Sequence, residues 1–239
     1  MPTKSNVPKR NIDRRRTPHT LYSMFPTLER YRVVPVIAIE DAEAALPLAD
    51  ALLDGGLPLV EITFRTAAAA SVIRILTEKR PELYVGAGTV LTVQNIKDAI
   101  AAGAKFGVAP GCNPDILEMA EAHLWPFIPG VCTASEIEAS LQMNYRVMKF
   151  FPAGLMGGVG MLKALSGPYA HTGVRFMPTG GVTESNLADY LSIPTVLACG
   201  GTWIATKSDI AAGNWPLIRD RCRRVIDIVG TGPATEPDA

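Results

Sequence analysis

The sequence predicts an α/β fold, a single-domain (β/α)8 (TIM) barrel, and three observations support that prediction. Short apolar runs alternate with helical patterns from residue 33 onward. The runs are continuously apolar, which is typical of parallel strands covered by helices. Eight such runs occur in 239 residues, which is the number and the approximate length of a closed barrel. A doubly wound open sheet is the alternative architecture.

The elements follow one another regularly along the chain. Strands are predicted at Val33–Ala38, Leu59–Thr63, Tyr84–Ala87, Phe106–Ala109, Phe127–Pro129, Val147–Phe150, Arg175–Pro178 and Val196–Cys199. Helices are predicted at Asp41–Asp54, Ala67–Lys79, Thr92–Ala102, Asn113–His123, Ser135–Met143, Met156–Leu165, Thr183–Tyr190 and Pro216–Val229. Polar residues before these helices and glycines after them are the usual start and stop signals. An extra helix at Thr20–Arg30 is expected to precede the first strand.

The charge distribution separates the chain into a basic extension at 1–19, the barrel at 20–229 and a tail at 230–239. Residues 1–32 carry eight Lys or Arg against two acidic residues. We expect a disordered extension without a nucleic-acid partner, because no apolar core segment accompanies these charges. Weak nucleic-acid binding is the alternative. The extension also lacks the apolar region of a secretory signal.

The remaining composition favours a cytoplasmic protein. No apolar run approaches the roughly 20 residues that a membrane helix needs, so no membrane partner is expected. Four scattered cysteines without a CxxC pair argue against a zinc site or a disulfide framework, and they fit a reducing compartment.

One lysine, Lys149, lies in the middle of the apolar run Val147–Phe150. Burying an ammonium group costs several kcal/mol unless a partner compensates. A lysine in such a place can instead lose its proton, and the neutral amine is a nucleophile toward carbonyl carbons. Lys149 is therefore a candidate for Schiff-base chemistry. The alternative is a lysine that reaches solvent or pairs with a carboxylate.

The predicted second strand carries two further candidates. Glu61 lies inside its apolar run, as Lys149 does in the sixth, and the two groups suggest a shared interior site in which Glu61 acts as a general base. A structural Glu–Lys ion pair is the alternative. Arg65 follows the strand and could bind a substrate carboxylate with its planar guanidinium, the alternative being a surface salt bridge.

Glycines cluster after the predicted third, seventh and eighth strands. Gly88 and Thr89 end the third run, where the backbone could approach a ligand and the hydroxyl could donate a hydrogen bond. The pairs Gly180–Gly181 and Gly200–Gly201, followed by Thr202, lie where barrels commonly bind phosphate. Exposed backbone N–H groups suit an anion. Each pair alone is also adequate as a turn. Pro110–Gly111 and Pro129–Gly130 are predicted to be tight turns.

These motifs together resemble the 2-keto-3-deoxy-6-phosphogluconate (KDPG) and 4-hydroxy-2-oxoglutarate (KHG) aldolases. The resemblance runs from about Val33 to Val229. The matching segments are Glu61-Ile-Thr-Phe-Arg65-Thr66, Gly86-Ala-Gly-Thr89-Val-Leu, Lys149-Phe-Phe-Pro152-Ala, Pro178-Thr-Gly-Gly181 and Gly200-Gly-Thr-Trp203.

The resemblance implies a class I aldolase that needs neither metal nor other cofactor and forms a homotrimer. Its substrate would be a small phosphorylated 2-keto acid, cleaved to pyruvate and glyceraldehyde 3-phosphate. Lys149 would form the imine, and Glu61 would move protons. Arg65 and Thr89 would hold the carboxylate, and Phe151 would pack beside the imine. Gly180, Gly181, Gly200, Gly201 and Thr202 would hold the phosphate.

Two positions depart from the family pattern. Gly154 stands where many members have Glu, and Thr202 stands where they often have Ser. The first departure bears on aldehyde specificity, whereas the second retains a hydroxyl. KHG or the galactonate-derived epimer of KDPG is an alternative substrate. A phosphate-binding barrel without catalytic activity is a further alternative, although that reading expects Lys149 or Glu61 to be replaced.

Overall fold

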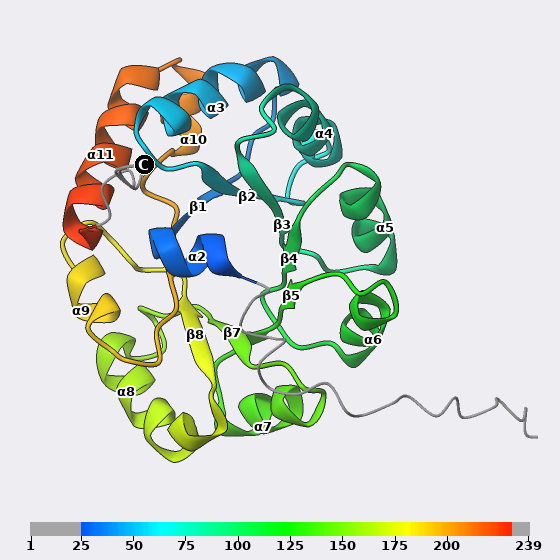
Figure 1. The fold of residues 1–239 in the computed structure, drawn as a ribbon, viewed down its shortest axis with the longest axis vertical. Helices are drawn as coiled ribbons and strands as arrows, with labels where there is room; N and C mark the ends of the chain where they lie inside the picture. Colours follow the sequence, from blue (N-terminus) through cyan, green and yellow to red (C-terminus); the bar gives the residue numbers. More distant parts are fainter. Residues whose placement is uncertain (1–24, 231–239) are drawn as a thin grey trace, which may run out of the picture.

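The computed structural model describes residues 25–230. The extension predicted at 1–19 lies outside this range, as does the predicted tail except for Gly230. Within the described range, the strands lie at the centre of a ring of helices, and helix α2 lies across one end of the strands (Figure 1).

All pairings between strands are parallel, as the uninterrupted apolar runs predict. The strands are β1 Val33–Ile37, β2 Leu59–Thr63, β3 Tyr84–Gly88, β4 Phe106–Val108, β5 Phe127–Ile128, β6 Gly130–Val131, β7 Val147–Phe150, β8 Arg175–Pro178 and β9 Cys199–Gly201. They form two sheets, with the orders β5-β4-β3-β2-β1-β9 and β6-β7-β8.

The helices alternate with the strands and cover them. They are α2 Pro26–Tyr31, α3 Ala45–Asp54, α4 Ala69–Lys79, α5 Val93–Ala101, α6 Pro114–Ala122, α7 Ala134–Gln142, α8 Gly158–Tyr169, α9 Leu187–Leu191, α10 Lys207–Ala211 and α11 Trp215–Val229, with short 3₁₀ turns at Ala42–Ala44 and Ala170–Thr172. None of the helices within residues 25–230 has both the length and the apolarity that crossing a membrane requires.

The two sheets curl toward each other at both ends. β5 and β6 are consecutive and are separated only by Pro129, which has no N–H to donate. On the other side, isolated parallel bridges join Phe176 to Val196 and Thr179 to Gly200, which brings β8 beside β9. The fold is therefore an α/β fold with a curled parallel sheet, as predicted, and the open doubly wound alternative does not describe it.

The strands and the helices both bury residues in the core of the fold. Every residue of β1 and of β2 is buried. The helices bury one stripe each, for example Val72, Ile73 and Leu76 of α4. Side-chain caps begin several helices where the sequence predicted them. Asn113 accepts a hydrogen bond from the amide of Asp115 at the start of α6, with Pro114 as its first residue.

The structure corrects the prediction in several places. Helix α9 begins at Leu187, whereas the sequence predicts Thr183, and α8 ends at Tyr169, whereas the sequence predicts Leu165. The last strand is Cys199–Gly201, which begins three residues and ends two residues later than the predicted Val196–Cys199, because Val34 and Pro35 pair with Gly200 and Gly201. Gly130 is part of strand β6 and does not form a turn. The short helix α10 was not predicted, since five residues carry too little periodicity to be recognised.

The helix predicted at Thr20–Arg30 lies partly outside the described residues. Within them, α2 spans Pro26–Tyr31 and begins with a proline.

Candidate active site

Lys149 and Glu61 meet inside the curled sheet. Nζ of Lys149 lies 3.4 Å from Oε1 of Glu61, and the two residues are 5% and 0% exposed. They come from β7 and β2, which do not pair with each other, so their contact spans the interior of the curled sheet. The structure therefore brings together the two isolated charges of the apolar strands, as both a shared interior site and a structural ion pair predict.

Only one of the two carboxylate oxygens of Glu61 has a hydrogen-bond partner among the described residues. Among the described residues, Oε2 accepts no hydrogen bond although it is buried. An unpaired buried polar atom costs about 1–3 kcal/mol, and such atoms are concentrated at functional sites. An oxygen with spare acceptor capacity beside a buried amine is suited to exchanging protons with a bound molecule.

Arg65 is held by a neighbour on the same strand end. Its Nε donates a hydrogen bond to Oγ1 of Thr63 at 3.1 Å, and Thr63 in turn donates to the carbonyl of Ile37. Arg65 makes no ion pair with any described residue. The surface salt bridge considered as an alternative is thus absent from residues 25–230, and the guanidinium nitrogens beyond Nε are available to an anion.

Thr89 follows the last residue of β3 and adopts a left-handed backbone conformation, with φ of 54°. Such a conformation is uncommon for a residue other than glycine and is typical of functional sites. β3 pairs with β2 in a register that places Gly88 opposite Thr63. Thr89 and Arg65 therefore lie just beyond the ends of adjacent strands, as the prediction for carboxylate binding requires.

Phe151 lies beside the lysine. The centre of its ring is 5.3 Å from Nζ of Lys149, within the range of a cation–π contact. The loop after β7 is fixed to the loop after β8 by two backbone hydrogen bonds. The amide of Ala153 donates to Thr179, and the amide of Gly154 donates to Gly180 at 2.7 Å.

The first glycine pair lies against this loop. Gly180 and Gly181 have φ values of 84° and 86°, which only glycine adopts readily. A Cβ atom at Gly181 would lie 2.9 Å from Cα of Gly154, and one at Gly154 would lie 3.1 Å from Cα of Gly181. The departure at Gly154 therefore falls directly against the predicted phosphate loop, where its lack of a side chain permits close contact.

The second glycine pair lies at the end of β9, with Thr202 exposed beyond it. Gly200 faces Thr179, whose Oγ1 would lie 2.2 Å from a Cβ atom at residue 200. The bridge between Thr179 and Gly200 joins the two loops. The structure thus brings both glycine pairs to the same end of neighbouring strands.

Sequence reasoning missed the buried hydroxyl groups of the site, Thr63 and Thr179. Both are nearly inaccessible, and both lie at the ends of apolar strands. A polar residue at the end of a buried strand is the signal that could have found them, as it does for Thr89.

One groove of the described chain lies away from these residues. No group of three or more His, Cys, Asp or Glu within residues 25–230 is arranged to hold a metal ion. A groove of about 380 Å³ lies at the amino ends of the strands, lined by Arg30, Tyr31, Tyr84 and Lys105 among others. Since parallel strands place their carboxyl ends at the opposite edge, this groove is distant from the predicted site.

Comparison with known proteins agrees with this arrangement. A family model described as "KDPG and KHG aldolase" matches residues 26–221. The chain belongs to this aldolase family. A 2-dehydro-3-deoxy-phosphogluconate aldolase of Treponema pallidum is 46% identical over 88% of this chain and 99% of its own.

Solved structures of this aldolase family have the same fold. A KDPG aldolase from Legionella pneumophila, crystallised with pyruvate captured as a covalent carbinolamine intermediate, has a TM-score of 0.80. It is 41% identical, over 83% of this chain and 96% of its own. The KDPG aldolase of Zymomonas mobilis ZM4, solved with 3-phosphoglycerate, has a TM-score of 0.78 and 35% identity over 86% of this chain and 95% of its own.

Proposed function

We propose that the protein is a class I, Schiff-base aldolase that cleaves 2-dehydro-3-deoxy-6-phosphogluconate to pyruvate and glyceraldehyde 3-phosphate. The observation that carries the proposal is the buried contact of 3.4 Å between Lys149 and Glu61 in a member of the KDPG and KHG aldolase family. A phosphate-binding barrel without catalytic activity would have no use for this buried pair.

Lys149 is the nucleophile in this proposal. Its neutral amine attacks the C2 carbonyl carbon to give a carbinolamine, which loses water to become an iminium ion. Breaking the bond between C3 and C4 then leaves its electron pair on the three-carbon fragment, where the iminium accepts it as an enamine. Phe151, whose ring centre is 5.3 Å from Nζ, packs beside the iminium and excludes water.

Glu61 moves the protons that these steps require. It assists loss of the hydroxyl from the carbinolamine, removes the proton of the C4 hydroxyl as the bond breaks, and returns a proton to C3 of the enamine. A fixed general acid/base of this kind contributes about 10²–10⁴-fold. The unpaired Oε2 is the atom available for this exchange, directly or through one water. Hydrolysis of the iminium then releases pyruvate and restores the amine.

Arg65 and Thr89 hold the carboxylate of the pyruvyl part. The guanidinium, fixed through Nε by Thr63, presents its remaining donors to the two carboxylate oxygens. Thr89, beyond the neighbouring strand, adds a hydroxyl donor. These contacts to the carboxylate position C2 next to Lys149, so that the attack becomes an intramolecular step.

The phosphate binds at the other end of the substrate, to Gly180, Gly181, Gly200, Gly201 and Thr202. Glycines let the anion approach backbone N–H groups closely, and Thr202 supplies a hydroxyl. The bridge between Thr179 and Gly200 supports the assignment, because it places both loops on one side of the site.

The architecture that we infer is a complete (β/α)8 barrel in one domain, in which β5 and β6 together make the fifth strand. The isolated bridges between β8 and β9 support this closure. We assign residues 20–229 to the barrel, with α2 as an extra helix at its floor. We further propose that the protein is a cytoplasmic homotrimer, on the basis of the family resemblance. We propose no nucleic-acid or membrane partner.

The test is a cleavage assay in which pyruvate release from KDPG is followed by coupled reduction. The wild-type protein is expected to release pyruvate, and Lys149→Met, which keeps the volume but has no amine, is expected to release none above background. Equal activity in the two proteins would refute the proposal. Running KDPG, its galactonate-derived epimer and KHG in parallel identifies the preferred substrate, because the family model covers both KDPG and KHG aldolases.

A further inference from the structure

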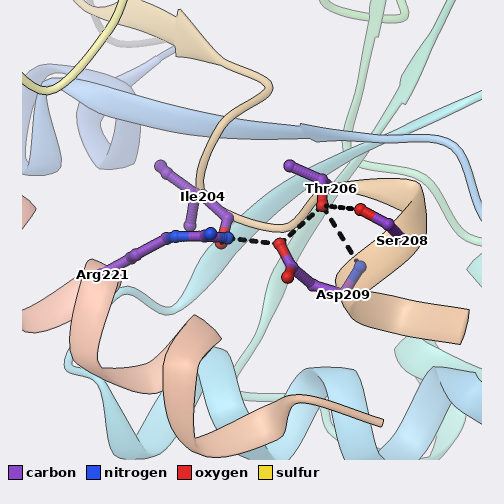
Figure 2. Close-up of polar contacts among 5 residues, drawn as sticks. All are labelled: Ile204, Thr206, Ser208, Asp209 and Arg221. Atoms are coloured by element: carbon purple, nitrogen blue, oxygen red, sulfur yellow. Dashed lines mark hydrogen bonds and ion pairs between the residues drawn. The ribbon is translucent and has the colours of Figure 1, made fainter. Parts of the chain in front are cut away.

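A partly buried ion pair lies behind the second glycine loop and connects it to the last helix. Figure 2 shows Arg221, from α11, pointing toward Asp209 of α10 and the backbone of Ile204. Nη1 of Arg221 lies 2.5 Å from Oδ2 of Asp209 and donates to the carbonyl oxygen of Ile204 at 3.3 Å. Asp209 is buried and Arg221 is half-buried, so water reaches this contact only in part.

Asp209 also fixes the beginning of α10. The hydroxyl of Thr206 donates to Oδ2 of Asp209 at 2.5 Å, and the amide of Asp209 donates back to Thr206 Oγ1. Hydrogen bonds from Thr206 and Arg221 hold the pKa of the Asp209 carboxyl below its ordinary value. The group is therefore an anion at neutral pH and holds both the helix start and the arginine.

The hydrogen bond from Arg221 to the carbonyl of Ile204 connects the ion pair to the Gly200–Thr202 loop. Ile204 is two residues beyond Thr202, and its side chain is fully buried. Its Cδ1 would lie 3.1 Å from a Cβ atom at Gly201, after two atoms of the Trp203 ring at 2.6 and 2.9 Å, so Trp203 and Ile204 together pack against that glycine. Nη1 of Arg221 thus contacts both Ile204, which packs against Gly201, and Asp209, which lies in the segment that follows the loop.

We propose that Arg221 and Asp209 are positioning residues that fix the Gly200–Thr202 loop for the phosphate group and act through the loop rather than on the phosphate itself. The inference rests on the proposed function, because it presumes that the loop binds phosphate. A misplacement of about 1 Å in a positioned group can cost about a hundredfold in rate. The carboxylate end of the substrate, held from β2 and β3, does not depend on this ion pair.

The test compares Arg221→Gln with Arg223→Gln. Arg223 lies on the same helix but contacts Asp54 and Asp220 near the surface. Two affinities are measured in each folded protein. One is the inhibition constant of inorganic phosphate in the cleavage assay, and the other is the pyruvate concentration that half-saturates borohydride trapping. For Arg221→Gln we expect the phosphate constant and the KM for KDPG to rise about tenfold or more, with the pyruvate value within about twofold of wild type.

Two results would overturn the inference. One is an unchanged phosphate constant in Arg221→Gln, and the other is an equal loss of phosphate and pyruvate affinity, which indicates general loosening of the fold. If Arg221→Gln does not fold, Arg221→Lys is used, because it keeps the charge without the planar fork. We expect a smaller rise in its inhibition constant for phosphate, again without a change in the half-saturating pyruvate concentration. A wild-type protein that traps no pyruvate overturns the proposed Schiff-base function, and one that traps pyruvate but is not inhibited by phosphate overturns the proposed phosphate site. A failure of the inference alone is seen when the wild-type protein does both and Arg221→Gln shows one of the two results above.

Discussion

Gly88 lies so close to Glu61 that a Cβ atom at residue 88 would be 2.1 Å from Oε1 of the carboxylate. The two residues lie on adjacent strands, and Oε1 is the atom that contacts Lys149. Glycine at the end of β3 therefore provides the space in which the carboxylate reaches the lysine. The sequence suggests that Gly88 lets a ligand approach the backbone, whereas in the structure the group that approaches it is the side chain of Glu61.

Gly88→Ala should therefore displace Glu61 and reduce kcat. Because the added methyl group and Oε1 cannot both keep their positions, we expect a loss of about ten- to a hundredfold. Steady-state cleavage of KDPG measures it. Gly111→Ala is the matched control at another strand end, since a Cβ atom there would meet no atom within 4 Å and activity should be unchanged. Equal effects of the two changes would contradict this relationship.

Glu61→Gln keeps the shape of the side chain but cannot act as a base. We expect kcat to fall by about 10²–10⁴-fold, while pyruvate is still trapped slowly because Lys149 remains. The measurement is turnover alongside the trapping rate in the same preparation. Unchanged turnover would assign Glu61 to a structural ion pair with Lys149.

Thr63→Val removes the hydroxyl that accepts the hydrogen bond from Nε of Arg65. A hydrogen bond involving a charged group is worth about 1.5–3 kcal/mol, so the KM for pyruvate in aldol synthesis should rise about tenfold or more. Thr63→Ser retains the hydroxyl and should restore most of the affinity. A KM for pyruvate that stays at the wild-type value in Thr63→Val would show that Arg65 needs no such support or binds no carboxylate.

The phosphate loops predict a strong preference for phosphorylated substrates. Non-phosphorylated 2-keto-3-deoxygluconate should have a kcat/KM lower than that of KDPG by about 10²-fold or more, because the remote binding energy of the phosphate contributes to the reaction barrier. The two substrates are compared in the same coupled assay. Equal values would mean that Gly180–Gly181 and Gly200–Gly201 serve only the backbone geometry.

The charged members of the site could be predicted because each breaks an apolar pattern. Lys149 and Glu61 are isolated charges in apolar strands, and the local sequence alone is enough to identify them. The parallel strands and most helix boundaries were predictable for the same reason, since hydrophobic periodicity and capping residues are local features.

The remaining features depend on neighbours that are distant in the sequence. The true register of β9 is set by pairing with Val34 and Pro35, and the requirement for glycine at residue 88 is set by Glu61. A glycine after a proline usually forms a turn, so the sequence predicts a turn at Gly130. In the structure, the backbone of Pro110 leaves no room for a side chain there, since a Cβ atom would lie 2.1 Å from its carbonyl carbon.

The central claim, that Lys149 forms the imine, is tested most directly by reductive trapping. The protein is incubated with pyruvate and borohydride and digested, and the peptides are weighed. If Lys149 forms the imine, a pyruvate-derived adduct is expected on the peptide containing Lys149 and is absent from Lys149→Met. An unmodified Lys149 peptide under conditions in which the enzyme turns over, or an adduct on a different lysine, would show that Lys149 is not the nucleophile.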